Sequence, residues 1–218
     1  HGMDQLETNF YQNIAFFSNY AHPFNDFFSI GVTAKIIYRK QLKINSSIAD
    51  VEELKDITKN RSAYENQAIA FAGDLGLNYK LPFKLKNNIA LTFADIGDIT
   101  FGGKKDRPEI TPIKQTINLG YALSHGILKG KADFSFDIRD LTGNVHTSHI
   151  KKIHIGTKYT YKDFVGFSLG LNQGYLGGGV FLTTKSISLD FGSYTEETNN
   201  LVGQKPNTRL FFKLQWSI

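Results

Sequence analysis

The stretch FSIGVTAKIIYR at residues 28–39 alternates apolar side chains with polar or small ones. One parity carries Phe28, Ile30, Val32, Ala34, Ile36 and Tyr38, and the other carries Ser29, Gly31, Thr33, Lys35, Ile37 and Arg39. Successive side chains of a strand point to opposite faces, so this period of two predicts a strand with one apolar face.

The same alternation recurs along the whole chain. Further clear segments lie at 69–80, 116–123, 132–139, 153–159, 165–171, 187–192 and 209–218, and weaker ones at 9–20, 87–96 and 175–184. We therefore expect 11 strands, most of them about 9 to 13 residues long. Globular strands are usually about 5 to 6 residues long, whereas a tilted strand that crosses a bilayer needs about 9 to 11.

Connections between these segments alternate between short and long. Short ones fall at 21–25, 81–86, 124–128, 161–163 and 184–185, and long ones at 41–66, 97–112, 140–148 and 197–207; only 172–174 is brief where a long one is due. Short periplasmic turns and long surface loops are typical of outer-membrane barrels. The sequence thus predicts an all-β, antiparallel, up-and-down transmembrane β-barrel in the cell outer membrane. A soluble sandwich or lipocalin-like barrel is the alternative.

One long connection contains a helical pattern, with Val51, Leu54 and Ile57 spaced by three residues. It is either a surface helix or a constriction folded into the pore.

The number of expected strands indicates whether the barrel is complete. Bacterial single-chain barrels have even strand numbers, so 11 strands in residues 1–218 suggest one barrel domain that lacks N-terminal strands and whose leader lies in the missing part.

In a membrane barrel the apolar parity meets lipid and the polar parity lines a watery bore. Residues expected in the bore are Lys35, Arg39, Asp74, Lys114, Asp133, Asp137, Arg139, Lys158, Asp190, Arg209 and Lys213. Aromatic rings prefer the headgroup level, and the expected girdle comprises Phe28, Tyr38, Tyr79, Tyr159, Tyr161 and Trp216. Membrane lipid is therefore one expected partner.

Composition excludes other classes of protein. No apolar run reaches the roughly 18 residues of a transmembrane helix, and the absence of cysteine excludes thiolate metal sites. The net charge of +5 is spread along the chain, which argues against nucleic-acid binding.

Catalytic motifs are missing from the sequence. No nucleotide-binding loop, HExxH, GxSxG or EF-hand pattern occurs. His146 and His149 have no acidic cluster beside them, and Asp133 and Asp137 would stand roughly 13 Å apart on one strand. Residues 177–179 are three glycines, which suggest a close backbone approach or a bend. We expect no enzyme activity, including that of lipase or protease barrels, and no cofactor or metal.

Five strings occur in an order that suggests a family: GDLGLNYK at 73–80, DIRDLTG at 137–143, KIHIG at 152–156, GLNQGY at 170–175 and YTEE at 194–197. Together they resemble the C-terminal part of FadL-like outer-membrane proteins, with the spirochaetal FadL-like and conjugal-transfer TraF-type groups nearest. The resemblance implies a barrel of 12 to 14 strands, an N-terminal plug absent from this chain, and diffusion of hydrophobic nutrients such as long-chain fatty acids.

Two functions follow as hypotheses. The first is a porin-like channel for passive uptake of hydrophobic or small nutrients, including fatty acids. The second is a structural or assembly barrel of a secretion or conjugation system, with periplasmic or secretion partners, which the TraF-type likeness and the long loops favour.

Overall fold

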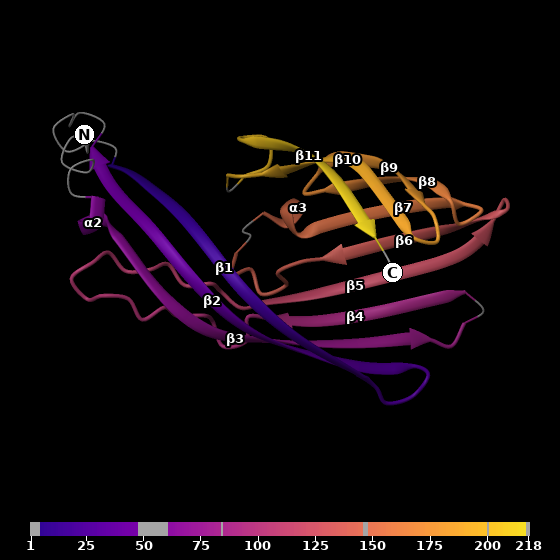
Figure 1. The fold of residues 1–218 in the computed structure, drawn as a ribbon, viewed down its shortest axis with the longest axis horizontal. Coiled ribbons are helices and arrows are strands. Elements are labelled where there is room, and N and C mark those ends of the chain that lie inside the picture. Colours follow the sequence, from indigo (N-terminus) through magenta and orange to yellow (C-terminus); the bar gives the residue numbers. More distant parts are fainter. Residues whose placement is uncertain (1–4, 48–60, 84, 146–147, 200, 217–218) are drawn as a thin grey trace. The chain divides into compact units, whose positions relative to one another are not determined.

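A computed structural model describes residues 5–47, 61–83, 85–145, 148–199 and 201–216. Within these ranges, eleven strands form one sheet in chain order, each antiparallel to the next (Figure 1). They are β1 (Gln5–Pro23), β2 (Phe28–Ser47), β3 (Glu65–Leu81), β4 (Lys86–Ala94), β5 (Thr116–Ile127), β6 (Gly130–Ile138), β7 (Ile153–Tyr161), β8 (Val165–Asn172), β9 (Tyr175–Thr183), β10 (Ile187–Glu197) and β11 (Pro206–Trp216). The expected all-β, up-and-down architecture and the strand number are confirmed.

Two short helices accompany the sheet, α2 (Arg61–Tyr64) and α3 (His149–Lys152). In the part of the chain that is described, no helix has the length and apolar character needed to cross a membrane. The helical pattern expected around Val51, Leu54 and Ile57 lies outside the described residues.

Strand lengths differ from the expectation at the N-terminal end. β1, β2 and β3 contain 19, 20 and 17 residues, whereas β4 to β11 contain 8 to 12. The connection expected at 41–66 is correspondingly shorter, because β2 continues to Ser47 and β3 begins at Glu65. Lys40 interrupts the apolar parity, but Leu42 and Ile44 resume it, so the end of this strand was placed too early.

The two faces of the sheet differ as the parity of the sequence requires. On β8, the side chains of Val165, Phe167, Leu169 and Leu171 are 39–56% exposed, and they alternate with Gly166, Ser168, Gly170 and Asn172, which are all half-buried. We call the face that carries the exposed apolar side chains the outer face and the opposite one the inner face. An apolar surface of this extent, left uncovered, marks an interaction surface.

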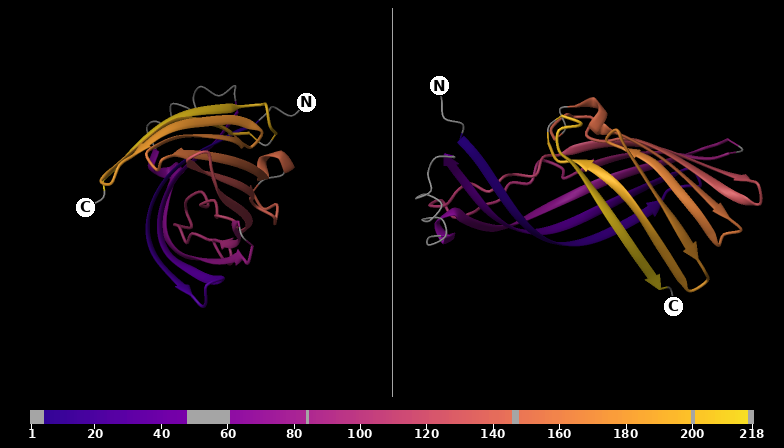
Figure 2. Two further views of the ribbon diagram at one scale, coloured as in Figure 1. Left: turned by 90° about the vertical axis from the view of Figure 1, so that its right-hand side faces the viewer. Right: turned by 90° about the horizontal axis from the view of Figure 1, so that it is seen from above.

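Glycines on the inner face allow neighbouring strands to approach closely. A Cβ atom on Gly177 would lie 2.9 Å from the Ser193 carbonyl oxygen, and one on Gly179 would lie 2.7 Å from that of Phe191. Such separations are too short for any larger residue, so these positions need glycine if the sheet is to curve. Figure 2 shows β8 to β11 as adjacent strands of one curved layer. The close approach expected at residues 177–179 is therefore present.

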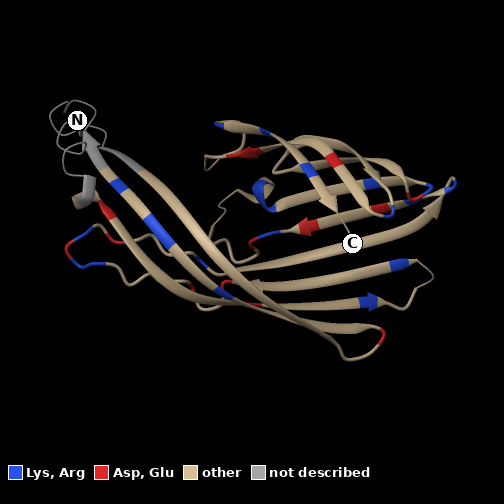
Figure 3. Ribbon diagram, viewed as in Figure 1, with Lys and Arg blue, Asp and Glu red and all other residues tan. Residues whose placement is uncertain are grey.

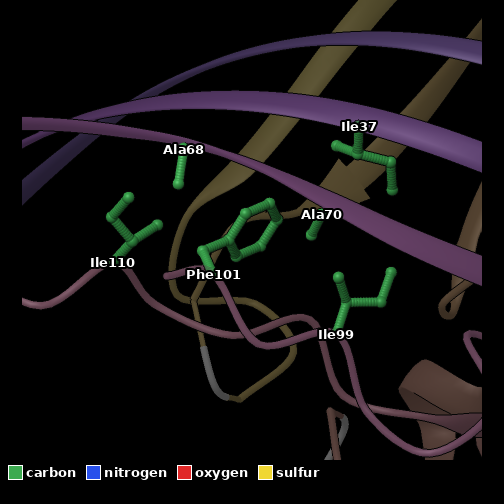
Figure 4. Close-up of a cluster of buried hydrophobic side chains, with 6 residues drawn as sticks. All are labelled: Ile37, Ala68, Ala70, Ile99, Phe101 and Ile110. Carbon is green, nitrogen blue, oxygen red and sulfur yellow. The ribbon is translucent and has the colours of Figure 1, made fainter. Parts of the chain in front are cut away.

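The chain divides into two compact units, which are described separately. Unit 1 comprises residues 1–20, 32–74 and 95–115, and unit 2 comprises residues 21–31, 75–94 and 116–218. Unit 1 holds the main apolar core of the described residues (Figure 4), formed by Ile37, Ala68, Ala70, Ile99, Phe101 and Ile110. Three of these side chains belong to the segment 95–115 between β4 and β5, which packs on the inner face of β2 and β3.

Candidate functional site

A cavity of about 1130 Å³ opens on the inner face of unit 2. Charged side chains expected in the bore line it from two neighbouring strands: Asp133, Asp137 and Arg139 from β6 and just beyond it, and Lys158 from β7. Antiparallel pairing sets Asp133 directly opposite Lys158, and Asp137 opposite His154. The alternation of the sequence thus places four of the expected residues around one cavity.

Three paired glycines form part of the lining of this cavity. Gly156 pairs with Gly170, and Gly170 pairs with Gly177, so three glycines from β7, β8 and β9 form a row across the sheet. All three line the cavity. This row was not predicted as part of the site, although it could have been found by pairing the inner-parity glycines of consecutive expected strands.

Aromatic rings cover other inner-face glycines. A Cβ atom on Gly166 would overlap the ring of Phe181, and one on Gly192 would lie 2.7 Å from the ring of Phe211. The Lys158 Nζ atom lies 3.9 Å from the centroid of the Phe181 ring, as a cation–π contact. The inner face therefore offers both apolar and cationic contacts within unit 2.

Polar side chains that were not predicted complete the lining. His154 is buried, and its Nδ1 lies 2.6 Å from Asn172 Oδ1, while Asn172 Nδ2 donates to the Thr195 carbonyl oxygen. Ser135 and Ser168 also line the cavity. These residues have the same parity as the predicted ones, but a search restricted to charged residues did not select them.

Four other expected bore residues lie in unit 1: Lys35, Arg39, Asp74 and Lys114. Lys35 Nζ contacts two carboxylates, Asp74 at 2.6 Å and Asp95 at 2.8 Å. Asp74 Oδ1 also accepts a hydrogen bond from the Asp95 backbone N–H. This group fixes the start of segment 95–115 against β2 and β3.

Arg39 is buried beneath the same segment. Its guanidinium carbon lies 5.2 Å from the Tyr11 ring centroid and 4.8 Å from that of Phe101. Arg39 Nε donates to Asn13 Oδ1, and Nη1 donates to the Thr111 carbonyl oxygen at 2.6 Å. Gln41, which is 2% exposed, donates to Asn9 and Thr111 and accepts from the Thr111 N–H. Arg39 and Gln41 therefore serve to hold the segment.

The remaining expected bore residues are more exposed. Lys114 precedes β5 and pairs with Asp98 at 2.9 Å. Asp190 and Lys213 are direct neighbours across β10 and β11, and Arg209 pairs with Glu196 at 3.1 Å.

Asp98 lies outside the strands, where its carboxylate accepts the Gln115 backbone N–H at 2.7 Å. That hydrogen bond, together with one from Lys114, lowers the pKa of Asp98 below its ordinary value.

The expected girdle aromatics lie at several strand positions. Tyr79, Tyr161 and Trp216 are exposed, and Phe28 stacks on Phe24 at a centroid distance of 5.8 Å. The Tyr38 hydroxyl donates to Gln67, and the Tyr159 hydroxyl donates to the Leu128 carbonyl oxygen. Among the residues that the structure describes, no group of three or more His, Cys, Asp or Glu side chains could hold a metal ion.

Comparison with known proteins supports the fold. No family model matches the chain, and no curated protein matches it. Among solved structures, the crystal structure of the toluene transporter TbuX from Ralstonia pickettii is similar, with a TM-score of 0.52 and 15% sequence identity. The match covers 98% of this chain and 68% of TbuX. The chain therefore has a FadL-like, barrel-type fold, and its placement in the spirochaetal or TraF-type group stays a prediction.

Proposed function

We propose that this protein is a transport barrel of the bacterial outer membrane that passes hydrophobic or small solutes without an energy source. The proposal rests on the difference in polarity between the outer and inner faces of the sheet in unit 2. Exposed Leu and Phe side chains cover the outer face of β8, whereas the inner face lines a cavity with Asp133, Lys158 and a row of glycines. Such strands suit lipid on one side and water on the other.

The fold shared with a toluene transporter supports a transport role. Long-chain fatty acids remain our candidate substrates, as the sequence resemblance implies. We also keep the proposal that further strands, and a plug, complete the barrel. Within the described sheet β1 and β11 are edge strands, and an unpaired edge exposes hydrogen-bonding groups that a membrane does not tolerate.

Transport can be tested with the full-length gene product in lipid vesicles. We expect faster entry of a radiolabelled long-chain fatty acid, or of a small polar solute, than into protein-free vesicles. Inert vesicles containing folded protein would contradict the proposal, and co-purification of periplasmic proteins with such a barrel would favour the assembly role.

Two adjacent substitutions provide a matched control. Ser168 lines the cavity, whereas Phe167 is its exposed neighbour on the outer face of the same strand and does not line it. Ser168→Trp should reduce the flux because the indole fills space in the cavity, and Phe167→Trp should leave the flux unchanged because the indole faces lipid. Equal fluxes in the two variants would show that the cavity is not the path.

A further inference from the structure

Lysines collect at one end of the sheet in unit 2, where the short turns lie. We call Lys80, Lys86, Lys129, Lys131, Lys162 and Lys185 the lysine rim; they occupy the turns β3–β4, β5–β6, β7–β8 and β9–β10 or the adjoining strand ends. Figure 3 shows Lys and Arg at this end of β3, β4, β6 and β7. All six side chains are exposed. Each short turn from β3 to β10 therefore contributes positive charge.

Few carboxylates balance this charge. At the same end of unit 2 the described turns contain Asp26 and Asp163, and Asp133 lies farther along β6, where it pairs with Lys131 at 2.9 Å. No carboxylate of the described residues is within ion-pair distance of Lys80, Lys86, Lys129 or Lys185. The rim therefore has an excess of uncompensated cations.

The opposite end of unit 2 uses its charges differently. Arg209 pairs with Glu196, and Lys151 Nζ donates to the Asn199 carbonyl oxygen at 2.6 Å. The Glu197 carboxylate accepts backbone N–H groups from Asn199, Gly203 and Lys205. The groups named here organise loops at that end, whereas four lysines of the short-turn end make no ion pair within the described residues.

Three members of the rim border the cavity. Lys80, Lys86 and Lys131 line the cavity itself, and Lys158 lines it farther along β7. Tight turns fix the outer members, because Lys129 has φ 59° and Lys162 has φ 50° and the Lys162 N–H donates to the Lys129 carbonyl oxygen. A second cavity of about 480 Å³ lies between these turns, lined by Lys129, Lys131 and Lys162.

We propose that the lysine rim is an anion-selecting mouth, which concentrates solutes bearing carboxylate or phosphate groups and disfavours cations. Rings of Lys or Arg act in this way in anion pores, and a low-dielectric wall focuses their field into the opening. The selectivity part of this proposal rests on the proposed transport function, because it requires ions to pass through the barrel. Binding of an anion at the rim does not require transport.

Selectivity is measured as the reversal potential of the full-length protein in a planar bilayer under a KCl gradient. We expect chloride to permeate more readily than potassium. In the triple variant Lys80→Gln, Lys86→Gln and Lys131→Gln, the ratio of chloride permeability to potassium permeability should fall about threefold or more. The reason is that each lysine removed would act on a passing ion across only a few ångströms of partly hydrated space. Preference for potassium, or a ratio near one, in the wild-type protein would overturn the proposal.

A matched control removes the same charge elsewhere. Lys104, Lys105 and Lys205 are exposed lysines on long connections between strands. Changing these three to Gln should leave the permeability ratio unchanged. An equal fall in this control would show that net charge, and not the rim, sets the selectivity, and would also overturn the proposal.

Anion binding separates this proposal from the transport function. Fluorescence anisotropy of a trisulfonated pyrene dye should report binding to the detergent-solubilised full-length protein at low salt. Binding should weaken in the rim variant and persist in the control variant, and it should decrease from 0.1 M to 1 M salt as the screening length falls from about 10 Å to about 3 Å. If the dye binds but the protein passes no current in the bilayer, the proposal of an anion-binding rim stands and the transport function is rejected. If the protein shows neither dye binding nor anion selectivity, the proposal of the rim is rejected.

Discussion

Unit 1 and unit 2 contain strands with the same alternation of apolar and polar side chains, but the inner face is covered by another segment in unit 1 and lines a cavity in unit 2. In unit 1, Arg39 and Gln41 are buried beneath segment 95–115 and bond to it. In unit 2, Asp133 and Lys158 line a cavity instead. The comparison teaches that alternation determines which side chains share a face, whereas a covering segment determines whether that face is a packed core or a lining.

The cover in unit 1 depends on apolar packing. Phe101 is 8% exposed in the cluster with Ile37 and Ala70, so Phe101→Ala should destabilise the docking of segment 95–115 by about 3 to 5 kcal/mol. Hydrogen exchange of the amides of Ile99 and Ile113, which bond to each other's carbonyl oxygens, measures this local free energy.

Phe71 provides the control, because it is 77% exposed on the outer face of β3. Phe71→Ala should leave the exchange of Ile99 and Ile113 unchanged. Equal acceleration in both variants would mean that the segment is not held by the cluster.

In unit 2 the two faces should respond oppositely to charge. Phe167 lies on the outer face of β8 and Ser168 lines the cavity. Phe167→Arg should lower the free energy of unfolding in lipid by about 2 to 4 kcal/mol if the side chain lies at mid-membrane depth, and Ser168→Arg should lower it far less, because a charge facing lipid is costly and one facing a hydrated lumen is not. Urea titration in vesicles measures both, and a larger loss for Ser168→Arg would reverse our assignment of the faces.

Arg39 and Arg209 allow the stabilising effect of a buried arginine to be compared with that of an exposed one. Arg39 makes two hydrogen bonds and two ring contacts under segment 95–115, whereas Arg209 makes an exposed ion pair with Glu196. Arg39→Ala should cost about 1.5 to 3 kcal/mol, because buried partners lose charged hydrogen bonds, and Arg209→Ala about 0 to 1 kcal/mol. Denaturant midpoints under identical conditions measure the difference; similar losses would contradict the burial of Arg39.

The smallest expected effect concerns Asp98. Its pKa is lowered by the Gln115 N–H and by Lys114, so the folded state favours the ionised form. The resulting stabilisation is fully present above the unfolded pKa near 4 and is lost as the pH falls through the folded pKa below it. Exchange of the Gln115 amide, corrected for its intrinsic pH dependence, should therefore accelerate in acid. In Asp98→Asn the acid-dependent part should vanish, and its persistence would assign the effect to another group.

Much of the fold could be predicted from the sequence, because a period of two is a local property. The strand number and the face of each side chain followed from segments such as 28–39 and 165–171. The length of β2 did not follow, since Lys40 interrupts the apolar parity that Leu42 and Ile44 resume.

The candidate site was predicted less completely. Asp133, Asp137, Arg139 and Lys158 meet at one cavity because parity and pairing bring them together. Arg39 carries the same parity signal, yet it is buried by a segment about 60 to 70 positions farther along the chain. Such long-range packing leaves no periodic trace, and Phe101 and Ile110 lie in a stretch without alternation.

The central claim is that the apolar parity faces lipid and the polar parity faces water, and the absence of native cysteine allows a direct test. Single cysteines are placed in turn at Asp133, Phe134, Ser135, Phe136, Asp137 and Ile138 of β6 in the full-length protein in vesicles. We predict rapid labelling by a charged, water-soluble thiol reagent at 133, 135 and 137, and protection at 134, 136 and 138. Uniform labelling, or labelling of the even positions alone, would contradict the account.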